Sequence, residues 1–241
     1  MGSWKRLTKP RFLFVYPVAA ALLLMSHITE ASLRVGLVFL VLGQAVRLWA
    51  NGYVGHQKVN VSAKTAGSVK IGRLTTAGPY TFVRHPLYLG TLLIGTGFCV
   101  VVGYPWVSLA AFAGFCLAYH AKMLEEERTL RDECGADYDA YHAAVPRLLP
   151  FRRPYPHRHG RWAWQGIAAS KEWKTVIWVS VAFVALYFWE ELMQEHGTFF
   201  GAHGARHVAL AAAAVGLAAV DGLSEWCTRR MQPPARSTAA A

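Results

Sequence analysis

The sequence predicts an all-α fold, a polytopic bundle of about six transmembrane helices. Three observations support this. Of 241 residues, 54% are hydrophobic and only 16% are charged, with a mean hydropathy of +0.24; charged residues make up about a quarter of a typical soluble domain. Six apolar stretches approach bilayer length, and the cations gather between alternate stretches. The net charge of +11 therefore indicates cationic membrane faces. A nucleic-acid-binding domain would spread such charge over a soluble core.

The six stretches, in chain order, are residues 12–28, 33–50, 87–102, 106–120, 176–193 and 208–226. A transmembrane helix needs about 20 apolar residues, with about 17 as the lower limit. The third and fourth stretches are short, and only Gly103, Tyr104 and Pro105 separate them. We expect these two stretches to form a tight helical hairpin.

The distribution of cations predicts the orientation. With both termini in the cytoplasm, the cytoplasmic segments contain 22 of the 25 Lys and Arg residues. The external loops contain only Arg34 and Arg206, and Arg47 lies near the inner end of the second stretch. This asymmetry follows the positive-inside rule, so we expect the active surface on the cytoplasmic side.

The same pattern divides the chain into five segments. Residues 1–50 hold the first two transmembrane helices, and residues 51–151 form a core of cytoplasmic loop, helical hairpin and cytoplasmic helix. A basic cytoplasmic linker follows at 152–175, then the last two transmembrane helices at 176–231. Residues 232–241 have the composition of a disordered tail.

The first group of residues that could perform chemistry lies before the third stretch. Gly78-Pro79 predicts a turn, and Pro86 suits the first turn of a helix, where its missing N–H is not needed. Arg84 and His85 would then lie at a helix N-terminus, whose free N–H groups attract a carboxylate or phosphate. The alternative is a snorkelling arginine within an interfacial aromatic belt. These residues alone leave both interpretations open.

The second group follows the fourth stretch, which we expect to continue into the cytoplasm as one helix. Lys122 and Glu126 are four residues apart and share a helix face. Three consecutive acids, Glu125 to Glu127, are unusual beside so many cations. The alternative is a solvated helix end with weak ion pairs, which we favour for Arg128 and Arg131.

Together the two groups resemble a known family. The chain reads Gly-Pro-Tyr-x3-Arg-His-Pro-x-Tyr-x-Gly from Gly78, then a Glu-Glu pair, then Gly-x2-Tyr-x2-Tyr-x3-Val-Pro-Arg from Gly135. This order and spacing are similar to those of the isoprenylcysteine carboxyl methyltransferases, which belong with the phospholipid methyltransferases among the integral membrane methyltransferases. The resemblance covers roughly residues 35–150, and the joint spacing makes it specific, because Arg-His-Pro alone carries little information.

The resemblance implies an enzyme that transfers a methyl group from S-adenosylmethionine, with a cofactor pocket at the cytoplasmic face. The cofactor is a zwitterion with a sulfonium, so its carboxylate needs donors or a helix N-terminus. Its ammonium or ribose hydroxyls need an acceptor such as Glu126. The expected cofactor-binding residues are Arg73, Leu74, Thr75, Tyr80, Arg84, His85, Pro86, Leu87, Tyr88, Gly90, Glu126 and Glu127.

In this family a substrate-orienting arginine lies four residues before the first acid of the pair, and that position is Lys122 here. We expect Lys122 and Glu126 to be catalytic, and Lys122 and Arg47 to bind substrate. Arginine grips a carboxylate with a planar fork whereas lysine is a point charge, so this difference leaves the acceptor open. A charge inside a membrane helix is a functional candidate. Arg47 is close enough to the inner end to snorkel, and we favour that alternative.

The acceptor is not fixed by these residues. A prenylated thiol carboxylate, an aminophospholipid, a small thiol and a quinone-like lipid are all open. A carboxylate needs no base, whereas a thiol or amine must lose a proton to His85, His120 or Tyr88.

Two other classes of protein are alternatives. A membrane reductase of the sterol-reductase type would bind NADPH, but it should need more spans and a pocket for a second phosphate. A non-catalytic membrane scaffold would keep only the fold.

The expected partners are the lipid bilayer and a lipophilic or prenylated acceptor, without metal or nucleic acid. The four cysteines form no CxxC pair, and with the Ala/Arg-rich composition they suit a bacterial inner membrane. The basic stretch around His157-Arg158-His159 is expected to meet anionic headgroups.

Overall fold

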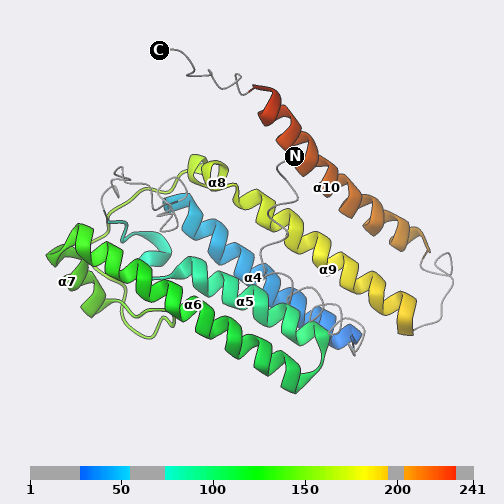
Figure 1. Ribbon diagram of the computed structural model, residues 1–241, viewed down its shortest axis with the longest axis horizontal. Helices are drawn as coiled ribbons and strands as arrows, with labels where there is room; N and C mark the ends of the chain where they lie inside the picture. Colours follow the sequence, from blue (N-terminus) through cyan, green and yellow to red (C-terminus); the bar gives the residue numbers. More distant parts are fainter. Residues whose placement is uncertain (1–27, 55–73, 195–203, 232–241) are drawn as a thin grey trace, which may run out of the picture. The chain divides into compact units, whose positions relative to one another are not determined.

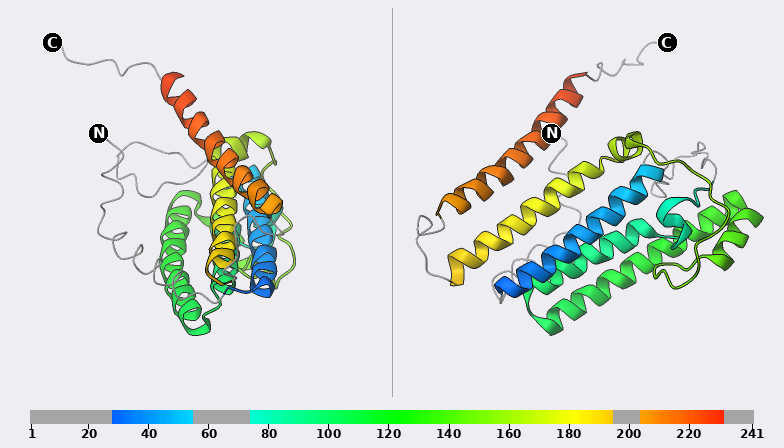
Figure 2. Two further views of the ribbon diagram at one scale, coloured as in Figure 1. Left: turned by 90° about the vertical axis from the view of Figure 1, so that its right-hand side faces the viewer. Right: turned by 180° about the vertical axis from the view of Figure 1, so that it is seen from behind.

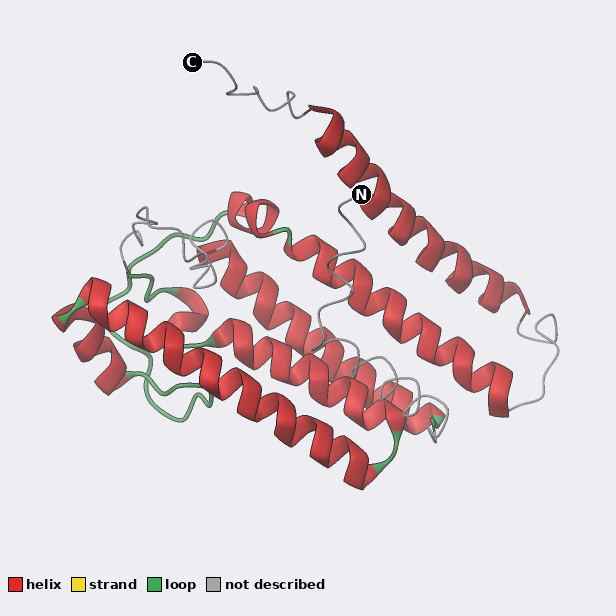
Figure 3. Ribbon diagram, in the orientation of Figure 1, coloured by secondary structure: helices red, strands yellow, loops and turns green. Residues whose placement is uncertain are grey.

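The computed structural model describes residues 28–54, 74–194 and 204–231 (Figure 1). Within these ranges the regular structure is helical and contains no strand (Figure 3). The predicted all-α class is therefore confirmed. Except for Ile28, the first predicted span lies outside the described residues.

The helices follow one another without long described loops, apart from the segment between α7 and α8. In chain order they are α4 (Glu30–Val54), the 3-10 helix η1 (Gly78–Thr81), α5 (Pro86–Val102), α6 (Pro105–Cys134), α7 (Ala136–Ala144), α8 (Trp164–Ser170), α9 (Glu172–Gln194) and α10 (Gly204–Met231). The chain divides into two compact units, Met1–Glu172 and Trp173–Ala241. Each unit is described by itself.

Two pairs of glycines bring α4 and α5 together in the first unit. A Cβ on Gly43 would lie 2.6 Å from the carbonyl oxygen of Gly90, and one on Gly97 would lie 2.8 Å from that of Gly36. The two helices thus run antiparallel with their backbones in contact, as small residues permit in membrane helices. Both views in Figure 2 show α4 and α5 side by side. This contact sets the position of the first turn of α5.

The predicted hairpin between the third and fourth stretches is confirmed. Helix α5 ends at Gly103, which adopts a left-handed conformation with φ 76°, and Pro105 begins α6. A left-handed glycine ends a helix at little steric cost, and proline suits the first position of the next. Helix α6 then runs unbroken for 30 residues to Cys134, as predicted for the helix that enters the cytoplasm.

The structure supports fewer membrane spans than the sequence predicts. Among the described residues, one helix, α4, is long and apolar enough to cross a bilayer by length and composition. Pro86–Val102 and Val208–Ser224 are apolar but shorter. The count of six spans therefore stays a prediction.

Residues 151–163, which we call the strap, lie against the loop before α5. The backbone N–H of Thr76 bonds to the carbonyl of His159 at 2.9 Å, and that of Tyr155 bonds to the carbonyl of Thr81 at 2.9 Å. At the end of the strap, the N–H of Ala163 bonds to the carbonyl of Gly52 in the last turn of α4 at 2.9 Å. The sequence predicts a linker from residue 152, and in the structure these hydrogen bonds tie the segment to the core.

In the second unit, an acid on α10 joins it to α9. Asp221 forms an ion pair with Lys174 at 2.6 Å and accepts a hydrogen bond from the Trp178 indole N–H at 3.1 Å. Asp221 is only 7% exposed. A buried carboxylate needs such partners to offset its lost hydration.

Candidate active site

The site forms where separate pieces of the motif meet. The backbone N–H of Arg84 bonds to the carbonyl of Pro146 at 2.9 Å, and that of His85 bonds to the carbonyl of Arg147 at 3.1 Å. The Tyr141 hydroxyl bonds to the carbonyl of Tyr80 at 2.7 Å. Segments that are about 60 residues apart in sequence are therefore one structural unit.

Helix α5 begins as the sequence predicts. Pro86 occupies its first turn and His85 is the residue before it, with no side chain capping the helix among the described residues. Proline has no N–H to satisfy, so the uncapped donors of the first turn are those of Leu87 and Tyr88. These two groups are the place where an anion could bind.

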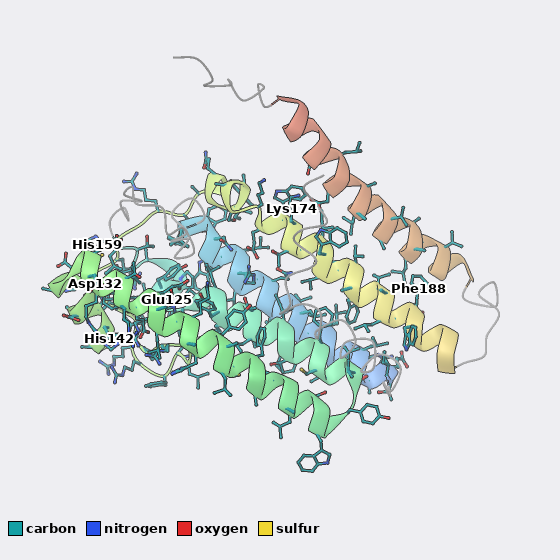
Figure 4. All side chains as sticks on the ribbon, in the orientation of Figure 1. Glu125, Asp132, His142, His159, Lys174 and Phe188 are labelled. Atoms are coloured by element: carbon teal, nitrogen blue, oxygen red, sulfur yellow. The ribbon has the colours of Figure 1, made fainter. Side chains whose placement is uncertain are left out.

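Glu127 lies at the centre of a buried cluster of cations. Its Oε1 accepts hydrogen bonds from Arg84 Nη2 at 3.0 Å, His85 Nε2 at 3.0 Å and Arg147 Nε at 3.0 Å. Its Oε2 accepts one from Arg147 Nη2 at 2.7 Å. Glu127 is only 5% exposed, so each of these charge-assisted bonds is shielded from water. His142, labelled in Figure 4, lies 3.9 Å from Oε2 at the edge of the cluster.

The cluster keeps Glu127 ionised. Burial alone would raise the pKa of this carboxyl, but hydrogen bonds from His85 and Arg147 and the charge of Arg84 outweigh it. The pKa of Glu127 is therefore held far below its usual value. Burial and the negative charge of Glu127 in turn raise the pKa of Tyr138 to about 12. Burial and the charge of Arg84 lower the pKa of His142.

Arg84 uses its whole guanidinium within this cluster. Nε and Nη2 bond to Glu127, and Nη1 bonds to the carbonyls of His142 at 2.8 Å and Val145 at 2.7 Å. Its side chain is 8% exposed. This geometry favours a positioning role for Arg84.

Glu126 differs from Glu127 in having an open side. Its Oε1 accepts a hydrogen bond of 2.6 Å from the Tyr88 hydroxyl, and its side chain is 26% exposed. Its Oε2 lies 3.8 Å from His85 Nδ1, which is too long for a direct hydrogen bond. Glu126 is thus fixed in place by Tyr88 and can still accept hydrogen bonds from a ligand.

Glu127 orients the ring of His85. Because ionised Glu127 can only accept, the proton on Nε2 of His85 must point to it. In the singly protonated ring, Nδ1 is then an acceptor that faces Glu126 Oε2. A donor with two hydrogens placed between these atoms could bond to both. We call this pair of atoms the acceptor notch.

Aromatic rings continue the site along α5 and α6. The ring centroids of Tyr88 and Tyr119 are 5.3 Å apart in an edge arrangement, and those of Tyr119 and Phe115 are 4.4 Å apart. Such aromatic pairs stabilise the contact between α5 and α6 by more than the burial of their surface alone would. Tyr119 and Phe115 lie on α6 within the predicted fourth stretch, so the apolar side of the site faces the predicted bilayer region.

The remaining predicted cofactor residues lie around this centre. Leu74 packs against the buried cluster of Tyr138, Tyr141 and Val145. Burial, with the charges of Tyr141 and Glu126, raises the pKa of Tyr80 well above its usual value. Half-buried Thr75 lies beside Gly160 of the strap. Arg73 lies outside the described residues.

Two predicted residues face α4 instead of the acceptor notch. A Cβ on Gly90 would lie 2.5 Å from Arg47 Cγ, so Gly90 belongs to the contact between α4 and α5. The carbonyl of Leu87 accepts a long bond of 3.4 Å from Arg47 Nη1. Pro86 is fully buried.

Arg47 is paired inside the first unit. Its Nε and Nη2 bond to the two oxygens of Glu172 at 2.6 and 3.0 Å, and Nη1 bonds to the Thr91 hydroxyl. Asn51 Nδ2 also donates to Glu172 Oε2 at 2.9 Å. Glu172 is 1% exposed. The favoured interpretation of a snorkelling arginine is therefore wrong, because a buried carboxylate from the start of α9 holds the guanidinium.

Lys122 lies one helical turn before Glu126 on α6 and is exposed. In the part of the chain that the structure describes, it makes no ion pair. Its predicted role in binding a substrate stays a prediction.

The structure adds four residues to the predicted site region. Arg147 stands in the Val-Pro-Arg piece of the motif, and that position was the available signal. For Tyr119, the only signal in the sequence is its spacing from Glu126. Glu172 and Asn51 are isolated polar residues with no local pattern, so their pairing with Arg47 could not be predicted.

Comparison with known proteins agrees with the resemblance. The sequence model of the phospholipid methyltransferase family matches residues 31–135. A probable protein-S-isoprenylcysteine O-methyltransferase of Oryza sativa subsp. indica is 29% identical over 153 residues, which cover 56% of this chain and 76% of that protein. The counterpart from Oryza sativa subsp. japonica gives the same values.

A third relative is the protein-S-isoprenylcysteine O-methyltransferase B of Arabidopsis thaliana. It is 31% identical over 122 residues, which cover 48% of this chain and 58% of that protein. No solved structure matches the chain significantly. These matches confirm the resemblance to this family that the motifs predict.

Proposed function

We propose, from its resemblance to the phospholipid methyltransferase family, that the chain is an integral membrane methyltransferase that uses S-adenosylmethionine. Its acceptor is lipophilic or partitions into the membrane, and the activity resembles isoprenylcysteine carboxyl O-methylation. The observation that carries this proposal is the state of Glu126. This acid accepts a hydrogen bond from Tyr88 and remains partly exposed, whereas the adjacent Glu127 is neutralised by its cationic partners.

The residues present fit the cofactor. The acceptor notch of Glu126 Oε2 and His85 Nδ1 suits an ammonium group or a pair of ribose hydroxyls, both of which donate more than one hydrogen. The uncapped N–H groups of Leu87 and Tyr88 suit a carboxylate at the start of α5. Glu127 and Arg84 are saturated by each other and by their neighbours. Their contacts favour positioning over the direct cofactor contact that the resemblance implies.

The cofactor would supply a methyl group that its sulfonium already activates. The chain has then to align the acceptor and exclude water. Lys122, exposed beside Glu126, suits an anionic acceptor such as a carboxylate, which needs no base. If the methyl acceptor must lose a proton, His85 Nδ1 is the atom oriented to take it, since Glu127 fixes the ring proton on Nε2.

The proposal includes the membrane setting. We place several spans in the bilayer, with both termini and the site on the cytoplasmic side of a bacterial inner membrane, because 22 of 25 cations lie in the segments assigned to that side. The rings of Tyr119 and Phe115 line the apolar approach from which a lipid acceptor would enter.

The test is transfer of labelled methyl from S-adenosylmethionine into an organic extract. The purified full chain is given S-farnesyl-N-acetylcysteine, with phosphatidylethanolamine as a second acceptor. Glu126→Gln should reduce incorporation at least about tenfold, whereas Glu125→Gln should not. Glu125 is the matched control, because it is the exposed acid next in sequence. Absence of label from both acceptors would argue against the proposed acceptor class.

A further inference from the structure

The strap presents an exposed surface that the proposed reaction does not use. Its side chains Arg152, Arg153, Arg158 and Arg161 are exposed, although its backbone is held by hydrogen bonds to Gly52, Thr76 and Thr81. The strap differs from a solvated tail, because its backbone is already ordered and only the side chains have to be ordered on binding. Arg152 is partly engaged, since it bonds to the carbonyl of Ala143.

No acidic side chain neutralises this surface from nearby in sequence. The chain contains no Asp or Glu between Asp139 and Glu172. Arg153, Arg158 and Arg161 form no ion pair with any acid in the described ranges. The surface therefore carries a net positive potential that an anionic partner would neutralise.

Large apolar side chains flank these cations. Phe151 is 72% exposed and Trp164 is 73% exposed, at either end of the strap. The Trp162 and Trp164 rings meet at a centroid distance of 4.7 Å, and Trp162 is 39% exposed. Tryptophans beside cations are typical of a membrane interface, where the ring sits among headgroups.

The packing of Trp162 gives the depth of this surface. A Cβ on Gly52 would lie 2.0 Å from the Trp162 indole nitrogen, so the indole lies directly on the last turn of α4. Helix α4 is the candidate membrane span, and Gly52 is near its C-terminal end. The end of the strap thus lies at the level where that span leaves the bilayer. An RNA strand would also suit arginines and aromatics, but this depth favours lipid.

From this charge, aromatic content and depth, we propose that the strap is a binding surface for anionic phospholipid headgroups. The arginines bind the phosphate and the exposed aromatic rings enter the interfacial layer. The surface lies beside the loop of Thr76 and Thr81, which leads into the first turn of α5. It is separate from the acceptor notch and does not depend on the proposed reaction.

The test uses the purified full chain in a non-ionic detergent, titrated with short-chain phosphatidylglycerol and with phosphatidylcholine of the same tails. Native mass spectrometry or calorimetry should show binding of phosphatidylglycerol, weakened by salt. The double variant Arg158→Gln/Arg161→Gln should weaken it by about tenfold or more. The control Arg34→Gln/Arg128→Gln removes the same charge from other exposed positions and should not weaken it.

Two further measurements distinguish lipid from free phosphate and show whether each variant is folded. Trp164→Ala should weaken binding of the lipid but not of free glycerol phosphate. An unchanged thermal unfolding midpoint would show that each variant is folded. Equal affinity for both lipids, undiminished binding by Arg158→Gln/Arg161→Gln, or glycerol phosphate binding as tightly as the lipid would overturn the proposal.

Discussion

The Tyr88 hydroxyl donates a hydrogen bond of 2.6 Å to Glu126 Oε1, joining the first turn of α5 to the C-terminal half of α6. This bond occupies one oxygen of Glu126 and leaves the other facing His85. The neighbouring acid, Glu127, instead neutralises Arg84 and Arg147. Two consecutive carboxylates therefore have separate tasks, one open to a ligand and one internal.

The first prediction concerns the affinity for S-adenosylhomocysteine. Glu126→Gln and His85→Ala should each weaken binding at least about tenfold, or about 1.4 kcal/mol, because each removes one side of the acceptor notch. Tyr88→Phe should weaken it less, by about 1 kcal/mol, since it frees Glu126 without removing it. Calorimetric titration measures these values. Wild-type affinity in both Glu126→Gln and His85→Ala would contradict the assigned site.

The second prediction separates acceptor from cofactor at Lys122. Lys122→Ala should leave the affinity for S-adenosylhomocysteine unchanged and should slow transfer to an anionic acceptor, because the exposed ammonium makes no ion pair within the described residues. Lys122→Arg should retain transfer to a carboxylate, which an arginine binds with its planar fork. Steady-state kinetics with S-farnesyl-N-acetylcysteine checks this. Unchanged turnover in Lys122→Ala would contradict a role for Lys122 in binding the methyl acceptor.

The third prediction is a dependence of stability on pH through Glu127. Glu127→Gln should lower the free energy of unfolding by about 3 kcal/mol at neutral pH, because Arg84 and Arg147 lose their shared counter-ion. The folded pKa of Glu127 lies far below its usual value, and the unfolded one lies near about 4.3. The stabilisation is thus fully present above the unfolded pKa and is lost as pH falls toward the folded one.

Chemical unfolding in mixed micelles at several pH values measures this difference. The gap between wild type and Glu127→Gln should be constant above about pH 5 and should narrow below it. Glu125→Gln, which changes an exposed acid, should show no such gap. A gap that widens on acidification would contradict the role given to Glu127.

The fourth prediction concerns the contact between α4 and α5. Gly90→Ala should destabilise the protein by about 1–3 kcal/mol, because its Cβ would meet Arg47 Cγ at 2.5 Å and the Gly43 carbonyl at 2.7 Å. Gly114→Ala on α6 is the matched control, since nothing lies within 4 Å of its Cβ. It should be neutral or stabilising by up to about 1 kcal/mol. Equal effects of the two substitutions would refute close backbone packing there.

Local pattern was enough to predict several elements. Pro86, Gly103 and Pro105 each fix a helix boundary through backbone chemistry alone, so the start of α5 and the hairpin could be foreseen. The continuation of the fourth apolar stretch as one helix past Lys122 and Glu126 was also foreseen. The resemblance identified the residues around Glu126 because it depends on several pieces at set distances.

Long-range pairing could not be predicted in the same way. Arg47 was expected to reach the headgroups, but Glu172, 125 residues away, holds it. The strap was expected to be a linker, although its backbone bonds tie it to Thr76 and Gly52. Such contacts depend on how helices pack and not on a local period, and so the sequence contained no signal for them.

The most direct test of the central claim is calorimetric titration of the detergent-purified full chain with S-adenosylhomocysteine, with NADPH titrated in parallel. Binding of S-adenosylhomocysteine alone, weakened by Glu126→Gln but not by Glu125→Gln, is the predicted result. Binding of NADPH alone would contradict the claim in favour of a reductase. Binding of neither would contradict it in favour of a non-catalytic scaffold.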